Sequence, residues 1–111
     1  MCELRAGVLP DDPLAASVQF HADVLPRVLA AIEAGAAQLT VVFGPAGYDH
    51  SDWRKAVIAT LAREKAPVRI NALVCDDEAA IAAALAWLDG APAITGHILV
   101  LDGHGAGLVV S

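Results

Sequence analysis

The stretch Ala93-Ile94-Thr95-Gly96-His97-Ile98-Leu99-Val100-Leu101-Asp102-Gly103-His104 decides the fold of this chain. Its central residues are apolar without alternation and have glycine on both sides, which is typical of a strand buried on both faces. Such strands belong to parallel sheets, because the helices that connect parallel strands cover both faces. The stretch therefore predicts a parallel sheet whose last strand runs from His97 to Leu101.

Three further apolar runs precede this strand, and helix-like segments separate them. The predicted strands are Glu3 to Leu9, Gln38 to Phe43, Val68 to Val74 and His97 to Leu101. The predicted helices are Leu14 to Ala34, Asp52 to about Lys65, and a third that ends at about Leu88. Strand and helix alternate, so the sequence predicts an α/β fold: a four-stranded parallel sheet in sequential order with three helical segments.

Turn and cap signals define the helices further. Pro26 should kink or split the first helix, because proline lacks a backbone N–H. Ser51 is expected to cap the second helix, and Asp76 or Asp77 the third. Apolar residues recur at helical spacing in each helix. They are Leu14, Val18, Ala22, Leu25, Leu29 and Ile32 in the first, Trp53, Val57, Ile58 and Leu61 in the second, and Ile81, Leu85 and Leu88 in the third.

Composition limits the class of protein. The 111 residues suit a single domain, 1–111, and 57% hydrophobic against 18% charged residues excludes disorder and favours a large buried fraction or an oligomer. The net charge of -6 would repel phosphate backbones and anionic lipid, so we expect neither nucleic acid nor a membrane as partner. The N-terminus has no long apolar region, which favours a cytoplasmic protein.

The two cysteines, Cys2 and Cys75, fall at opposite ends of two predicted parallel strands. A strand length of roughly 17 to 20 Å would separate them. That distance is too long for a disulfide, so both are expected to be free thiols.

Three segments resemble the short-chain dehydrogenase/reductase family. Ile94-Thr95-Gly96 and Asp102-Gly103 fall where that family has ITGQ, an apolar run and DGG. Leu61 to Val74 is similar to its stretch LARELAP-IRVNAVAP, and Gln38 to Phe43 with Ala46-Gly47 to its active-site strand and AG turn. The resemblance covers about Gln38 to His104. It implies a small Rossmann-like half-domain whose last helix lies on the opposite face of the sheet.

The catalytic pattern that the resemblance implies is missing. The family uses a tyrosine, a lysine four residues later and a serine. Tyr48 is the candidate tyrosine, but Asp52 stands four residues later, and Phe43 and Gly44 stand where the serine would be. No glycine-rich turn lies between a first strand and its helix, so we expect no nicotinamide cofactor and no catalysis of the family's kind.

A metal site is the other chemistry that these residues suggest. Loops that follow parallel strands meet at one edge of the sheet, which would bring together His50, Cys75, Asp76 and His104. No paired ligand spacing supports such a site, and helix capping already explains Asp76 and Asp77. We therefore expect no metal ion.

Two functions remain. The first, which we favour, is a non-catalytic dehydrogenase-like domain that acts by protein association, as a homodimer or on a full-length dehydrogenase-like partner. The alternative is a nucleotide- or substrate-binding oxidoreductase, or an accessory subunit of one, with its site near Tyr48 and His104. Binding of NADH, NADPH or a metal would distinguish the two.

A homodimer is expected from uncovered surface. The family, as the resemblance implies, continues its sheet beyond the first strand present here, so Leu4 to Leu9 would be an open edge. It also commonly pairs subunits through the last strand and the helix before it. The expected interface residues are accordingly Trp87, His97, Leu99, Leu101, Leu108, Val109 and Val110.

Overall fold

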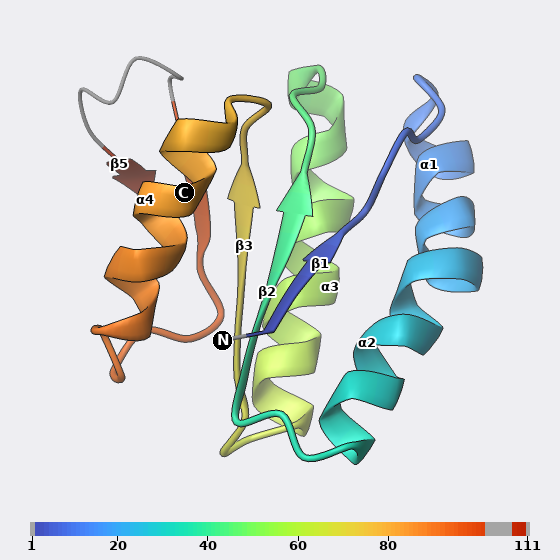
Figure 1. Cartoon of the computed structure of the whole chain (residues 1–111). Coiled ribbons are helices and arrows are strands. Elements are labelled where there is room, and N and C mark those ends of the chain that lie inside the picture. Colours follow the sequence, from blue (N-terminus) through green and yellow to red (C-terminus); the bar gives the residue numbers. More distant parts are fainter. Residues whose placement is uncertain (1, 102–107, 111) are drawn as a thin grey trace.

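The computed structural model describes residues 2–101 and the backbone of 108–110. The strands are β1 (Cys2–Arg5), β2 (Gln38–Phe43), β3 (Arg69–Val74), β4 (Ile98–Leu101) and β5 (Leu108–Val110). The helices are α1 (Pro13–Gln19), a π-helical turn η1 (Phe20–Val24), α2 (Leu25–Glu33), a 3-10 turn η2 (Tyr48–His50), α3 (Ser51–Glu64) and α4 (Glu78–Asp89). Figure 1 shows them in one sheet with helices on both faces.

The sheet has the order β1-β2-β3-β4-β5, and β1 to β4 are mutually parallel. This confirms the predicted four-stranded parallel sheet in sequential order. β5 adds an antiparallel edge strand beside β4, with Val100 opposite Val109. From the sequence, this segment was expected only as part of an interface, so its pairing within the chain was not predicted.

Helices α1, α2 and α3 cover one face of the sheet, and α4 covers the other (Figure 1). Alternate strand residues divide between these two cores: Leu39 and Val41 face α2 and α3, whereas Val42 and Leu73 face α4. The strands follow one another in one direction across the sheet. The crossover through α4 therefore has the opposite hand to the two before it. This is the placement of the last helix that the resemblance implied.

The first helix is split, as predicted, but the apolar residues expected from its spacing face the core only in part: Leu25 and Ile32 pack against it. Its buried residues are Ala16, Phe20, Val24 and Val28, each at most 2% exposed. Leu14 and Val18, which recur at helical spacing, are 79% and 70% exposed. The Phe20 ring lies 5.5 Å from the rings of both Phe43 and Trp53. This aromatic contact, together with the wider π-helical turn, decides which face turns inward.

β1 is shorter than predicted. It ends at Arg5, and Gly7 takes a left-handed φ of 74° that turns the chain out of the sheet. The carbonyl of Arg5 accepts a 2.7 Å hydrogen bond from Arg27 Nη2 on α2. Residues 6–9 therefore form the loop to α1, and they are not a strand.

The residues that carry the family resemblance form one hydrogen-bonded cluster before β4. The buried Asn71 donates through Nδ2 to the Ile94 carbonyl and accepts from the His97 N–H, both at 3.0 Å. Thr95 Oγ1 accepts from the Ile70 N–H at 3.1 Å, and Gly96 makes the turn with φ 78°. These contacts attach the segment before β4 to β3, so the motif has a structural role.

Cys2 and Cys75 are both free thiols, as predicted. Among the described residues, no helix is both long and apolar enough to cross a membrane.

Candidate functional site at the carboxyl edge of the sheet

The loop after β2 and the start of α3 form the centre of the carboxyl edge. The chain leaves β2 at Phe43 and enters the 3-10 turn η2, which continues directly into α3. The predicted cap at Ser51 is wrong, because η2 already provides the preceding turn and Ser51 is the first residue of α3. A Cβ atom at Gly47 would lie 2.7 Å from Asp49 Oδ1, so the Asp49 carboxylate folds back over this glycine.

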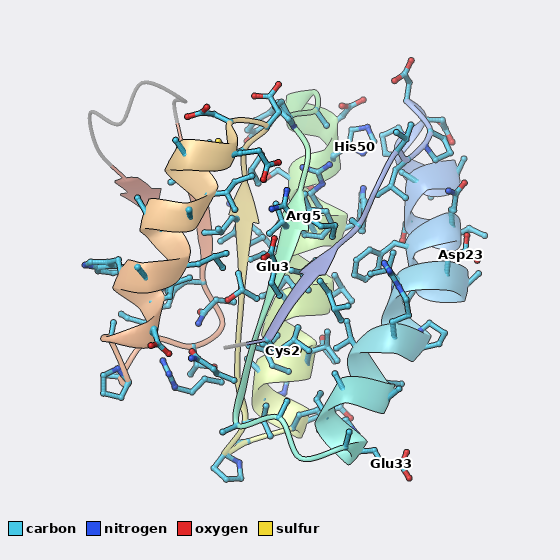
Figure 2. All side chains as sticks on the ribbon, in the orientation of Figure 1. Cys2, Glu3, Arg5, Asp23, Glu33 and His50 are labelled. Carbon is cyan, nitrogen blue, oxygen red and sulfur yellow. The ribbon has the colours of Figure 1, made fainter. Side chains whose placement is uncertain are left out.

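His50 links α3 to the loop after β1. It is buried, its Nε2 donates to the Asp11 carbonyl at 2.8 Å, and its Nδ1 accepts from Trp53 Nε1 at 3.1 Å. Figure 2 shows His50 at the upper end of the sheet, between the β1 and β2 loops. Both ring nitrogens are used within the chain, so the imidazole is a structural bridge.

Arg54 is the buried charge of this edge. Its side chain is 7% exposed and stacks on Phe43, with the guanidinium carbon 4.5 Å from the ring centroid. Nη1 donates to the Gly44 carbonyl at 3.1 Å, and Nε has no hydrogen-bond partner among the described residues. Burial lowers the pKa of the Arg54 guanidinium from its usual value.

Two cavities meet at Arg54. The larger, about 490 Å³, opens between the loops after β1 and β2, and its walls include Asp11 and Asp49. The smaller, about 260 Å³, lies between the start of α3 and strands β3 and β4. Its lining carries Arg54 and Lys55, its apolar part includes Val74, Ile98 and Val100, and no carboxylate is among its described lining residues.

The candidate for catalysis, Tyr48, lies on η2 and is 94% exposed. Phe43, which stands where the family's serine would be, is fully buried, and Asp52 is exposed in the first turn of α3. Phe43 therefore brings no hydroxyl to the end of β2, and Asp52 stands four residues after Tyr48, where the family has its lysine.

The candidate metal ligands lie apart. Cys75 belongs to the core under α4, where its Sγ accepts from the Asp77 N–H at 3.3 Å, whereas His50 lies at the start of α3 on the other face. Asp77, one of the two predicted caps, caps α4 by accepting from the Ala80 N–H at 3.1 Å. Asp76 is exposed, and His104 lies outside the described residues. Within residues 2–101, no three His, Cys, Asp or Glu side chains form a group that could hold a metal ion.

The predicted interface residues have different surroundings. Leu99 and Leu101 are buried beneath α4, and the His97 N–H is held by Asn71. Trp87 is 47% exposed on α4, and Val100, which was not predicted, is 39% exposed on β4. Leu108, Val109 and Val110 form β5, but their side chains lie outside the described part.

Arg54 was not predicted from the sequence, although a signal for it was present. The buried positions of α3 are Arg54, Val57, Ile58 and Leu61, so the apolar spacing of the helix extends back to a cation. A charged residue on the buried face of an amphipathic helix is the pattern that would have identified it.

Comparisons with curated proteins and with solved structures found no match. The family model described as short chain dehydrogenase-like protein matches residues 4–101, which is nearly all of the described sheet and its helices. The parallel sheet, the helix on the opposite face and the cluster around Asn71 lie within this matched region. The chain therefore belongs to the short chain dehydrogenase-like family.

Proposed function

We propose that this chain is a non-catalytic dehydrogenase-like domain that acts by protein association, with a homodimer as its basic unit. The absence of the family's catalytic pattern at Phe43, Tyr48 and Asp52 argues against a reaction of the family's kind. An exposed apolar surface on α1 and α2 supports association.

The outer stripe, which we define as Leu14, Val18, Leu25 and Leu29, is the observation that carries this proposal. These residues repeat at helical spacing beside the fully buried row Phe20, Val24 and Val28, and Leu25 packs at the border of that core. Leu14 and Val18 are mostly exposed, Leu29 is 38% exposed, and Leu25 is partly buried. An amphipathic helix with a second apolar stripe exposes surface that a partner would cover.

A groove continues the outer stripe toward α3. Leu25 and Leu29 line a cavity of about 450 Å³ together with Trp53, Val57 and Leu61. A two-fold contact would place the stripe of each copy in the groove of the other and so bury both at once. The open edge of β1 is a poorer site for adding a strand from a partner. The carbonyl of Arg5, at the end of β1, already accepts a hydrogen bond from Arg27.

Light scattering after size exclusion tests the proposal at tens of micromolar protein. The wild-type chain is expected to be a dimer, and Leu14→Glu combined with Val18→Glu is expected to be a monomer. Both residues are exposed, so these substitutions should leave the fold intact. The control is Trp87→Glu combined with Val100→Glu, at the end of the molecule formed by α4 and β4, and it should remain a dimer.

The outcomes are distinct. A wild-type monomer would contradict the proposed homodimer. A dimer that survives the Leu14 and Val18 changes but is lost in the Trp87 and Val100 control would place the interface at the end predicted from the sequence. Leu99 is unsuitable for this test, because it is 1% exposed and its substitution would unfold the core.

A further inference from the structure

Arg54 carries a charge that the described chain does not neutralise. It is 7% exposed, and its one hydrogen bond within the described residues goes to a neutral carbonyl, that of Gly44. Its Nε lacks a partner within the described residues. A buried cation without an anionic partner is costly, and a guanidinium binds planar oxyanions through paired N–H donors.

The smaller cavity beside Arg54 has the lining that an anionic ligand would need. Arg54 and Lys55 supply two positive charges, and the Ser51 hydroxyl is available at the first turn of α3. Of these two cavities, the larger is the one with carboxylates among its described lining residues, Asp11 and Asp49.

The rest of this cavity is apolar. Val74, Ile98 and Val100 form its wall on β3 and β4, and Val100 remains 39% exposed there. A volume of about 260 Å³ suits a small molecule with a short aliphatic body. A phosphate alone would leave this apolar wall uncovered, whereas a short branched carboxylic acid would cover it.

We propose that the cavity between α3, β3 and β4 binds a small amphiphilic carboxylate, with the carboxylate at Arg54 and the aliphatic body against Val74, Ile98 and Val100. The positive charge of Lys55, which also lines the cavity, adds long-range attraction for the carboxylate. This site is separate from the outer stripe on α1 and α2. The proposal therefore stands or falls independently of the homodimer.

Calorimetry with isovalerate as the probe tests the site, with isovaleramide as the neutral isostere and inorganic phosphate as the anion without an aliphatic body. The wild-type chain is expected to bind isovalerate with a Kd of about 1 mM or tighter. Isovaleramide and phosphate should bind at least about tenfold more weakly, because each lacks one half of the recognition.

Variants assign the contact. Arg54→Met keeps an aliphatic side chain on Phe43 and should weaken isovalerate binding by about tenfold or more. Arg63→Met, on the exposed end of the same helix, is the matched control and should bind as the wild type does. If Arg54→Met fails to fold, Val100→Glu is the deciding variant. It should weaken isovalerate binding, because an acid at this part-exposed position should repel the carboxylate.

Four results would overturn the proposal. They are no wild-type binding up to about 20 mM isovalerate, equal affinity for the amide, tighter binding of phosphate than of isovalerate, and unchanged affinity in both Arg54→Met and Val100→Glu. Absence of binding in a dimer that buries Val100 would identify a second protein copy, and not a small acid, as the occupant of this face.

Discussion

The imidazole of His50 connects two segments that are 39 positions apart in the sequence. The Asp11 carbonyl can only accept, so the hydrogen must be on Nε2, and Nδ1 is left as the acceptor for Trp53. The sequence placed His50 at the correct edge of the sheet. It could not show that both nitrogens are satisfied, because Asp11 lies on another loop whose position depends on the whole fold.

Removing this bridge should destabilise the fold. His50→Phe keeps a ring of similar size but loses both hydrogen bonds, so we expect the free energy of unfolding to fall by about 2 to 3 kcal/mol. Urea unfolding of His50→Phe, Trp53→Phe and the double variant should give a coupling energy of about 1 kcal/mol. His21→Phe, at an exposed position, is the control. Additive losses in the two single variants would show that the His50 to Trp53 bond contributes nothing.

The Arg5 and Glu78 pair joins β1 to the start of α4. Arg5 Nη1 and Nη2 each donate to Glu78 at 2.9 Å, and Arg5 Nε also donates to Glu3. Figure 2 shows Glu3 and Arg5 close together along β1. The hydrogen bonds from Arg5, and then its charge, lower the pKa of the Glu78 carboxyl from its usual value.

A lowered carboxyl pKa means that the pair stabilises the fold above the unfolded pKa of glutamate, about 4.3, and that this stability is lost as the pH falls through the folded pKa. Glu78→Gln should therefore have a lower Tm than the wild type at pH 7, and the difference should vanish by about pH 3. Because Glu78 is exposed, the difference should be small and should shrink in about 0.5 M salt. A Tm difference that persists at pH 3 would refute an ionic contribution. Glu64→Gln, exposed near the end of α3, is the control.

Elements were more predictable than their orientations. Gln38 to Phe43 was predicted at its observed bounds, and α4 and β4 within one or two residues, because buried strands and capped helices have local signals. The face of α1 was not predictable from spacing alone. Leu14 and Val18 match a helical stripe as well as Ala16 and Phe20 do, and the choice depends on Phe43 and Trp53, which are distant in sequence.

Paired truncations on this helix test the observed orientation. Phe20→Ala should lower the free energy of unfolding by about 3 to 5 kcal/mol, because it opens a cavity among the Phe43 and Trp53 rings. Val18→Ala, two residues away and 70% exposed, should change it by less than about 0.5 kcal/mol in the monomer. Urea unfolding at low protein concentration measures both. Equal losses would contradict the orientation of α1.

At the scale of the whole molecule, the order of the strands was predictable from alternation, and the position of the last helix on the opposite face of the sheet was predictable from the resemblance. For the site, the sequence predicted the location, at the carboxyl edge where all parallel strands end, but not the residues that form it. Its most distinctive residue, Arg54, was missed because a single cation in a helix is ordinarily solvated. Only the assembled fold shows that Arg54 stacks on Phe43 and lies beside a cavity formed with the end of β3 and with β4.

The same assembly explains why a nicotinamide dinucleotide should not bind. In the described part of the chain, α1, α3 and α4 each begin at the carboxyl edge, and acidic side chains stand at each start. Asp12 caps α1, Asp77 caps α4, and Asp52 lies in the first turn of α3. A pyrophosphate needs free N–H groups and positive potential at a helix N-terminus. Asp12 and Asp77 each occupy a backbone N–H, and the negative charge of all three carboxylates opposes a phosphate.

We therefore predict that calorimetry with NADH or NADPH will give a Kd weaker than about 10 μM for the wild-type chain. Asp12→Asn combined with Asp77→Asn retains the capping side chains but removes two charges, so it should lower the electrostatic barrier while leaving the caps occupied. The affinity of this double variant for NADH or NADPH should therefore rise by no more than a few fold, and its Kd should stay weaker than about 10 μM. Wild-type binding at about 10 μM or tighter, roughly -7 kcal/mol, would require a pyrophosphate site that none of these three helix starts provides. That result would restore the nucleotide-binding alternative and would make Tyr48, on the turn leading into α3, the first residue to substitute.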